Sequence, residues 1–321
     1  MNLNKFKNFF KNLQNKNVYI GFSGGADSRL ILEIAKYFQQ EYKYTLNAIN
    51  FEHGIRGKES IEDSNFCVNV CKQLGIPISV IPLKINANEK NIECVARQKR
   101  LDYYKTIAQK DKQHIILLGH HLDDKIENFF IRLSRGSNVS GLVSFGQYSY
   151  IDGVFIGRPL LNILKKDIVD YLQLNNIEYR TDSTNFNIEY HRNYLRNDLL
   201  KKWFGKFSFV KNGIITAIDN LTQDNDFIEK YSNDKFEFVY KNFLSNIPIN
   251  IDFYLQLHDA IRFRVLKRHI QLYDKKFEMC KGFFNSFNKM IKDYDNTNHK
   301  YLVVNDKLKI IIKGYKLYFS L

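Results

Sequence analysis

The residues best suited to chemistry form the run Ser23-Gly24-Gly25-Ala26-Asp27-Ser28. The apolar run 18–22 comes before it and is typical of a buried strand, and residues 29–38 follow with helical spacing. Two glycines between a strand and a helix let the backbone approach an oxyanion closely, and the helix N-terminus supplies free N–H groups and positive charge. The run therefore predicts an anion-binding loop rather than an ordinary turn. It lacks the Gly-Lys-Ser/Thr ending of the usual γ-phosphate-cleaving loop.

A second polar cluster lies at residues 119–127, where another apolar run meets a predicted helix. Its members His120, Asp123, Asp124 and Glu127 are three or four residues apart and can share one helical face. Carboxylates in such a cluster can hold Mg²⁺ against phosphate oxygens, or bind and deprotonate an amine. A helix N-cap would explain the two aspartates but not the histidines and Glu127, so we predict a functional cluster.

Two pairs of arginines are further candidates. Arg97 and Arg100 lie one helical turn apart, and Arg192 and Arg196 lie in a polar segment late in the first predicted domain. The first pair could neutralise a phosphate or polarise a carbonyl. The alternatives, solvated surface arginines and a capped helix with a basic face, stay open, and His53 could equally lie in a simple turn.

Strands alternate with helices through the first 200 residues, which predicts a doubly wound parallel α/β sheet. In such a sheet ligands bind beyond the carboxyl ends of the strands, so the loops after Phe22, Phe51 and Gly119 should converge. The predicted strands are 18–22, 44–51, 78–81 and 114–119, and the predicted helices are 29–38, 59–74, 92–110, 123–135, 165–176 and 189–204.

The length of 321 residues predicts two domains, 1–205 and 206–321, because the strand–helix pattern and the phosphate-type motifs end near 205. The second domain should be a smaller α+β domain, with helices that include the basic stretch 261–269 and with C-terminal strands at 301–304, 308–312 and 317–319. The net charge of +14 favours an acidic partner such as RNA only weakly, because an AT-rich gene would also enrich Lys, Asn, Ile, Phe and Tyr.

The four cysteines form no Cys-x-x-Cys pair, so neither a zinc knuckle nor a redox dithiol is indicated, and Cys67 and Cys71 are interpreted as core residues. The N-terminus lacks the continuous apolar core of a signal peptide, and no apolar run approaches membrane-spanning length. These features predict a protein of the reducing cytoplasm with no membrane partner.

Taken together, the motifs resemble those of the tRNA(Ile)-lysidine synthases, a family of pyrophosphate-loop (PP-loop) ATPases. The matching segments follow the family's order across most of residues 17–200, with small departures at Leu101, Asn128 and Asn138 that remove no charged group. The segments are SGGADS at 23–28, EHGIRGKES at 52–60, ARQKR at 96–100, GHHLDDKIEN at 119–128, RLSRGS…GL at 132–142, RPLL at 158–161, and DSTN with HRNYLRN at 182–197.

The resemblance implies an adenine nucleotide alpha-hydrolase-like fold and an ATP-dependent ligase. The enzyme would join free L-lysine to the wobble cytidine of the CAU anticodon of tRNA(Ile) through an adenylated cytidine. ATP would become AMP and pyrophosphate, and the lysidine formed would change the tRNA from methionine to isoleucine specificity.

The resemblance also implies roles for individual residues. ATP would bind at Ser23, Gly24, Gly25, Ala26, Asp27, Ser28, His53, Gly119 and His120. Mg²⁺ would lie near Asp27 and Asp123. Asp124 and Glu127 would hold the lysine and take its proton, and Arg97 would stabilise charge on the activated base or phosphate. RNA or nucleotide would contact Arg100, Arg192 and Arg196.

The C-terminal part matches the family only in general layout, and we expect it to bind tRNA. Two alternatives remain: a PP-loop tRNA thiolation enzyme, which would generally use cysteines, and a non-catalytic RNA-binding relative. The sequence leaves the oligomeric state open, a homodimer included.

Overall fold

The computed structural model describes residues 1–52, 54, 58–85, 92–180, 190–241, 249–295 and 298–320. The chain divides into two compact units, Met1–Ile218 and Asp219–Leu321. The division falls inside the long helix α10 (Val210–Lys241). The sequence predicts the domain boundary at residue 205, earlier in the chain than this division. That functional boundary stays a prediction.

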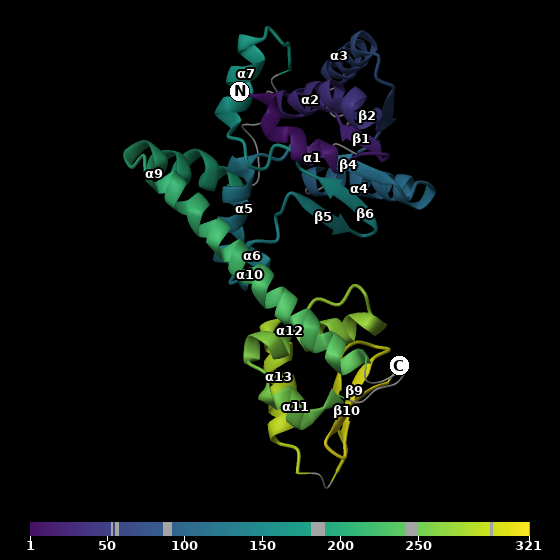
Figure 1. Cartoon of the computed structure of the whole chain (residues 1–321), viewed down its shortest axis with the longest axis vertical. Coiled ribbons are helices and arrows are strands. Elements are labelled where there is room, and N and C mark those ends of the chain that lie inside the picture. The colour runs from purple at the N-terminus through teal and green to yellow at the C-terminus, as the bar shows by residue number, and fades with distance from the viewer. Residues whose placement is uncertain are drawn as a thin grey trace. The chain divides into compact units, whose positions relative to one another are not determined.

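The first unit is built on a six-stranded sheet with the order β3-β2-β1-β4-β6-β5 (Figure 1). All neighbouring pairs are parallel except β5 and β6, which are antiparallel. The predicted doubly wound α/β fold is therefore confirmed, with one antiparallel strand at an edge. The strands are β1 (Asn17–Gly21), β2 (Thr45–Glu52), β3 (Ile78–Pro82), β4 (His114–Leu117), β5 (Tyr148–Ile151) and β6 (Val154–Gly157).

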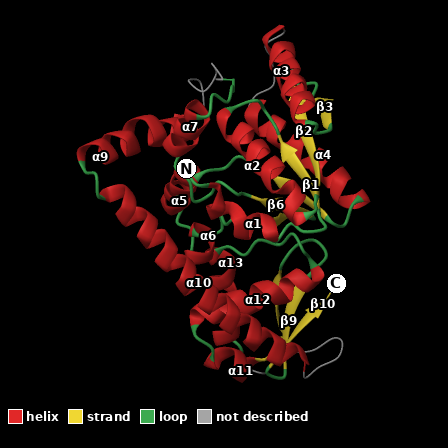
Figure 2. Cartoon of the chain, turned by 45° about the horizontal axis from the view of Figure 1, so that its top comes forward, coloured by secondary structure: helices red, strands yellow, loops and turns green. Residues whose placement is uncertain are grey.

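Helices cover both faces of this sheet, as Figure 2 shows. Alternate residues of β1 point to opposite faces: Val18 and Ile20 join the apolar cluster that includes α2, whereas Tyr19 packs with the cluster that includes α4. All four residues of β4 are buried, as expected of a central parallel strand. The helices of this unit are α1 (Lys7–Lys11), α2 (Ala26–Tyr42), α3 (Lys58–Leu74), α4 (Ile92–Lys110), α5 (Leu122–Ser134), α6 (Val139–Leu142), α7 (Lys165–Leu174), α8 (Tyr190–Asn193) and α9 (Lys201–Lys206).

The strand order reverses beside β1. The chain moves outward from β1 through β2 to β3 and then crosses back to place β4 on the other side of β1. The carboxyl ends of β1 and β4 are therefore adjacent at the switch point, where open α/β sheets bind their ligands. The loop after β1 holds residues 23–25, and the loop after β4 holds Gly119 and His120.

The second unit combines the later part of α10 with three helices and a small antiparallel sheet of order β7-β10-β9-β8. Its core includes Tyr254, Phe287 and Ile310, which are fully buried. The predicted smaller α+β domain is confirmed. Its elements are α11 (Ile251–Gln256), α12 (Asp259–Tyr273), α13 (Lys281–Lys292), β7 (Ile249–Asn250), β8 (Lys300–Val303), β9 (Lys309–Lys313) and β10 (Lys316–Ser320). None of the helices in the described part of the chain has both the length and the apolar character that a bilayer crossing requires.

The basic stretch 261–269 lies on α12, but its arginines are engaged within the unit. Arg264 and Arg268 bind the carboxylate of Glu229 at 2.7 and 2.5 Å, and Arg262 pairs with Asp259. Arg264 is also buried. Much of the positive charge of this helix is therefore neutralised by the unit's own acids.

His269, on the same helix, is buried between two aromatic rings. Its imidazole stacks on Phe319 with ring centroids 5.1 Å apart and meets the edge of Phe236 at 5.4 Å. Its Nδ1 has no hydrogen-bond partner among the described residues. Burial lowers the pKa of His269 from 6.5 to about 4, because the protonated ring cannot be solvated there.

This buried imidazole predicts a loss of stability in acid. Between pH 6.5 and about 4 the unfolded chain binds a proton at His269 that the folded chain does not, so the free energy of unfolding falls as the pH falls. From pH 7 to 4.5 the wild type should lose about 2 kcal/mol more than His269→Leu, measured by urea unfolding. The exposed His299 provides the control, because His299→Leu should follow the wild-type curve. Parallel curves for wild type and His269→Leu would contradict the prediction.

Candidate active site

The loop after β1 has the backbone geometry of an anion cradle. Gly24 has a φ of +81°, and a Cβ there would lie 3.2 Å from the Sγ of Cys67, so this position favours glycine on two grounds. The hydroxyl of Ser28 closes the loop, since it accepts a hydrogen bond from the Ser23 N–H at 3.2 Å and donates to the Gly25 carbonyl at 3.0 Å. α2 begins at Ala26, so its N-terminal N–H groups lie at the loop.

Residues beneath the loop hold it in place. The side-chain amide of Asn50 donates to the Phe22 carbonyl at 2.9 Å, and the Ser64 hydroxyl donates to the other end of the same side chain at 2.9 Å. Cys67 is buried against the same carbonyl. This fits the interpretation of Cys67 as a core residue.

The loop after β4 approaches the first loop closely. A Cβ on Gly119 would lie 3.0 Å from the Cβ of Asp27 and 3.3 Å from the backbone N of Ser28, so only a residue without a side chain fits here. α5 then begins with His121 as its N-cap, and the Asp124 side chain accepts a hydrogen bond from the His121 N–H at 3.0 Å. Asp124 therefore also has a capping role, which the sequence offered as the alternative to a functional cluster, but as the third residue of the helix and not as its N-cap.

Asp124 and Glu127 are buried one helical turn apart, and two arginines hold them. Arg192 donates to Glu127 and to Asp124, each at 3.0 Å. Arg196 donates to Glu127 at 2.6 Å and to Asp124 at 2.9 Å. Two cations thus neutralise two buried anions. The arginines themselves are partly exposed, with 35% and 40% of their side chains accessible.

The arginines come from a helical stretch with an unusual turn. α8 carries Arg192, and a π-helical segment, Tyr194–Leu200, carries Arg196 and leads into α9. π-helical turns are rare and frequently lie at functional sites. The predicted helix 189–204 is therefore helical from Tyr190 on but irregular at its centre.

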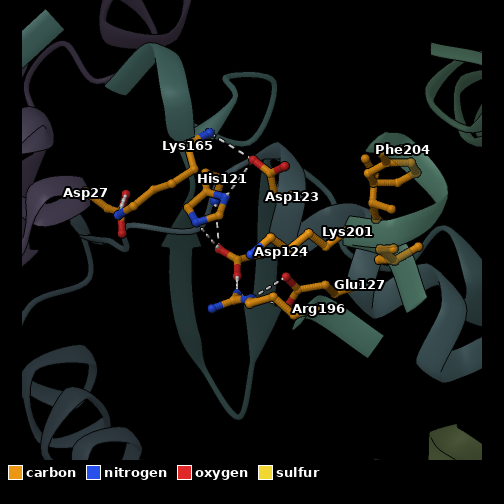
Figure 3. Close-up of a pocket in the computed structure, with 11 residues that line it drawn as sticks. Asp27, His121, Asp123, Asp124, Glu127, Lys165, Arg196, Lys201 and Phe204 are labelled. Carbon is orange, nitrogen blue, oxygen red and sulfur yellow. Dashed lines mark hydrogen bonds and ion pairs between the residues drawn. The ribbon is translucent and has the colours of Figure 1, made fainter. Parts of the chain in front are cut away.

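Two lysines hold the remaining carboxylates. The Nζ of Lys165 lies 2.6 Å from Asp27, and the backbone N–H of the same residue donates to Asp123 at 2.8 Å (Figure 3). The Nζ of Lys211 lies 2.6 Å from the other oxygen of Asp123. Sequence reasoning missed both lysines. Lys165 could have been noticed as the first residue of a predicted helix, but nothing in the sequence singles out Lys211.

The charges of neighbouring side chains determine whether Asp123 and Asp124 are ionised. Burial alone would raise the pKa of Asp123, but contacts with His121, Lys165 and Lys211 outweigh it and hold the pKa well below its usual value. Burial would likewise raise the pKa of Asp124, and the nearby histidines and Arg192 lower it. Both carboxylates are therefore ionised at neutral pH.

The two histidines of the cluster are shifted in opposite directions. Burial lowers the pKa of His120 to about 4, with the neighbouring charge of Arg158 acting in the same direction, so its ring is neutral. Burial would also lower the pKa of His121, but the carboxylates of Asp123, Asp124 and Asp27 raise it above its usual value.

The four acids, together with His121, Lys165 and Arg196, line a single cavity of about 430 Å³ in the first unit (Figure 3). It contains both parts of the predicted site, because Asp27 follows the β1 loop and the other acids begin α5. Cations and apolar side chains from α7, the π-helical segment and α9 complete its wall. The lining residues are Asp27, His121, Asp123, Asp124, Ile126, Glu127, Lys165, Arg196, Leu200, Lys201 and Phe204.

Other predicted site residues lie outside this lining. Arg97 is exposed on α4, and the Nε of Arg100 donates to the Ala96 carbonyl of its own helix at 3.3 Å. His120 accepts a hydrogen bond at Nδ1 from the buried Arg158 at 3.3 Å. His53 lies outside the described residues.

The donor set of the cavity is compatible with Mg²⁺. Asp27 and Asp123 both line it, and Mg²⁺ usually binds through one or two carboxylates together with substrate phosphates and water. In the described part of the chain no group of three or more His, Cys, Asp or Glu side chains could hold a metal ion. The ion would therefore depend on these two acids and on the phosphates.

A profile of the PP-loop domain matches residues 2–203, which is most of the first unit. The chain belongs to the PP-loop domain family. Its loop at 23–28 is therefore the PP-loop, and its sheet is the family's sheet. A U34-tRNA thiolase of Methanococcus maripaludis shares this fold, with a TM-score of 0.55 and 18% identity over 68% of this chain and 79% of that one.

Curated relatives are more similar in sequence. The tRNA(Ile)-lysidine synthase of Clostridioides difficile is 32% identical over 263 residues, or 79% of this chain and 56% of that protein. The tRNA(Ile)-lysidine synthase of Buchnera aphidicola subsp. Baizongia pistaciae is 27% identical over 97% of this chain and 68% of that protein. The chain thus spans a little over half to about two thirds of the length of these relatives.

The PP-loop geometry predicts different effects at its two glycines. Gly24→Ser should lower the free energy of unfolding by about 1–2 kcal/mol, because Gly24 is left-handed and packed against Cys67. Gly25→Ser should be neutral or stabilising, because Gly25 is the N-cap of α2 in an extended conformation and a Cβ there meets nothing closer than 3.6 Å. Urea unfolding of the two variants tests this, and equal losses would contradict it.

Proposed function

We propose that this PP-loop protein joins free L-lysine to the wobble cytidine of a CAU anticodon in tRNA(Ile), converting ATP to AMP and pyrophosphate. The observation that carries the proposal is the single cavity that unites the PP-loop side with two buried carboxylates suited to an amine. The curated relatives named tRNA(Ile)-lysidine synthase support the choice of substrates.

The triphosphate of ATP would bind at the PP-loop, with its pyrophosphate oxygens against the N–H groups of residues 23–28 and the start of α2. Gly119 keeps the second loop close enough to close the cradle. Lys165 and Lys211 carry positive charge beside the same acids. A Mg²⁺ ion held by Asp27 and Asp123 would neutralise the departing pyrophosphate.

In the first half-reaction, the C2 oxygen of the cytosine attacks the α-phosphorus and pyrophosphate leaves, which gives an adenylated base. The chain's part is to orient the two reactants and to stabilise the negative charge that develops on the phosphate. Arg97, exposed on α4, is our candidate for contact with the activated base or phosphate, and Arg100 for contact with the RNA.

In the second half-reaction, the lysine ε-amine attacks C2 and AMP leaves. An ammonium has no free electron pair, so the site must bind the charged amine and then accept its proton. Asp124 and Glu127 are suited to both tasks because they are buried, close together and within the cavity wall.

In the structure the two arginines occupy the contacts that the ammonium would make. A buried carboxylate left without a cation costs about 3–5 kcal/mol, so the lysine should replace a guanidinium rather than find an empty acid. Arg192 and Arg196 are partly exposed and can turn away while their helix stays in place. Once released, they would contact the adenylate or the RNA, which keeps their predicted role.

The two buried cysteines, Cys67 and Cys71, are unsuited to the chemistry of tRNA thiolation. Burial raises the pKa of Cys67 to about 12 and that of Cys71 to about 11, so both are protonated thiols at neutral pH. A thiolate is the reactive species in sulfur transfer. Cys67 instead packs beneath the PP-loop.

The second unit is our candidate for additional tRNA binding, and the cytoplasm is the compartment in which we expect the reaction. The paired arginines of α12 reduce the charge that this unit can offer to RNA. The helix that carries them is therefore a weaker candidate than its sequence suggests.

The direct test is a product assay. A transcript of tRNA(Ile) with a CAU anticodon, incubated with the protein, ATP and lysine, should yield lysidine when its nucleosides are analysed by mass. The same tRNA with a GAU anticodon should yield none, because it lacks the target cytidine. Modification of neither tRNA, with the protein folded, would contradict the proposal.

Glu127→Gln should separate the two half-reactions. Glutamine keeps the size of Glu127 and one acceptor oxygen, but it removes the charge that attracts an ammonium, the base that accepts its proton and one of the two oxygens that accept from the arginines. Loss of one buried ion-pair partner is worth about 3 kcal/mol, so conversion of the adenylate should slow roughly a hundredfold while adenylation continues. Single-turnover assays with labelled ATP can follow adenylated tRNA and AMP separately.

Asp27→Asn is the matched control, because it should block adenylation itself while leaving the thermal melt unchanged. If Glu127→Gln also blocks adenylation, Glu127 serves the ATP side of the cavity. If both steps keep the wild-type rate, Glu127 has no part in the reaction.

A further inference from the structure

The helical stretch from the π-helical segment through α9 to the start of α10 exposes apolar side chains to solvent. Trp203 is 39% exposed and Phe209 is 72% exposed, although large aromatic residues are usually buried. We call this set the outer aromatic face. It consists of Tyr194, Leu199, Trp203, Phe207 and Phe209.

Another side of the same stretch already supplies the packing that the fold needs. Leu200 and Phe204 join an apolar cluster with Ile218, and with Arg196 they line the cavity. These residues are four apart and share one helical side. Leu199 and Trp203, four residues apart, lie beside this row rather than on it, and Phe207 and Phe209 follow the end of α9. In Figures 1 and 2 α9 lies at an outer corner of the first unit.

Positive charge surrounds this face. Residues 194–211 contain five basic side chains and one acidic one, and two of the five, Arg196 and Lys211, are paired with acids of the cavity. Lys201 and Lys206 have no carboxylate partner among the described residues, and Lys202, although paired with Asp198, is 77% exposed. The ammonium of Lys206 lies 5.5 Å from the centre of the Phe207 ring. This differs from α12, where the arginines are neutralised within the unit.

We propose that the outer aromatic face stacks unpaired bases of an RNA loop while Lys202 and Lys206 contact its phosphates. Exposed aromatic rings beside lysines suit single-stranded RNA, since every base has a flat face to stack and every nucleotide a negative charge. The proposal rests on the proposed function for its substrate, the anticodon loop of a tRNA.

The position of the face supports this occupant. Lys201 and Phe204 line the cavity, whereas Trp203 lies between them in sequence, meets the ring of Phe130 on α5 at 6.2 Å between centroids and keeps its remaining surface open to solvent. A helix with its side chains is about 10 Å across, so a base in the cavity and its neighbours on the aromatic face can belong to one short loop.

A second copy of this chain is a less suitable occupant. A two-fold interface would bring the lysine-bearing faces of both copies together, and like charges repel. RNA brings the opposite charge.

Trp203 makes the proposal directly measurable because it is the only tryptophan in the chain. Its fluorescence in the full-length protein should be quenched saturably by an RNA hairpin that carries the CAU anticodon loop. A fully paired RNA duplex of equal length should quench it much less. Equal quenching by the two RNAs would overturn the proposal.

Variants test whether the rings contribute affinity. Trp203→Ala and Phe209→Ala should each weaken binding of the hairpin about tenfold, measured with labelled RNA, whereas Trp203→Phe should retain most of the affinity. Tyr37→Ala, which removes an exposed aromatic ring from α2, is the control and should bind as the wild type. Phe209 is the more exposed of the two residues. If Trp203→Ala does not fold, the affinity of Phe209→Ala for the hairpin tests the proposal.

Enzyme assays separate this proposal from the proposed function. If lysidine forms, Trp203→Ala should raise KM for tRNA about tenfold and leave KM for lysine unchanged. If both alanine variants have the wild-type KM and affinity for tRNA, the proposed RNA-binding surface is wrong. The proposed function is unaffected by that result. RNA-dependent quenching and weakened binding in the variants, without lysidine formation by the wild type, would support the surface and refute the function. A dimer that Trp203→Ala dissociates without any loss of RNA affinity would show that a second copy covers the face.

Discussion

Two buried carboxylates, Asp124 and Glu127, set the constraint on which the rest of the candidate site depends. Both lie at the start of α5, out of reach of bulk water, so their charge must be met by a nearby cation at every stage. In the structure Arg192 and Arg196 meet it from a segment more than sixty residues later in the chain. These ion pairs therefore hold the irregular helix that carries the arginines against the carboxylates. The position of the cavity wall depends on them.

The same constraint explains why an arginine pair and an amine substrate are compatible. A site with permanently unpaired acids would be unstable, whereas a site whose acids are held by partly exposed guanidinium groups can exchange one cation for another. The exchange keeps the net charge of the pocket constant. On the PP-loop side Asp27 and Asp123 follow the same principle with Lys165 and Lys211. Both halves of the cavity thus hold their acids in ion pairs with cations of the chain itself.

The sequence predicted the parts of the site that depend on neighbours along the chain. The PP-loop, the strands and the carboxylate spacing follow from local patterns of glycine, apolar and acidic residues, and the switch point follows from their order. The cation partners could not be predicted, because Glu127 and Arg192 are 65 residues apart and Asp123 and Lys211 are 88 apart. Such pairs are created only when helices pack. From the sequence we predicted that the two arginines contact RNA. Their ion pairs with the buried acids could not be predicted.

For the same reason, the number of basic residues in a stretch of sequence does not show whether that stretch forms an RNA-binding surface. The stretch 261–269 is the more basic in appearance, yet folding places Glu229 and Asp259 against its arginines. Residues 194–211 attract less notice as a sequence, but their helix turns lysines and aromatic rings outward together. What matters for a polyanion is the charge left unpaired after folding and the apolar surface beside it. By that criterion the RNA-binding surface that we propose begins in the PP-loop unit itself, next to the cavity where the chemistry would occur.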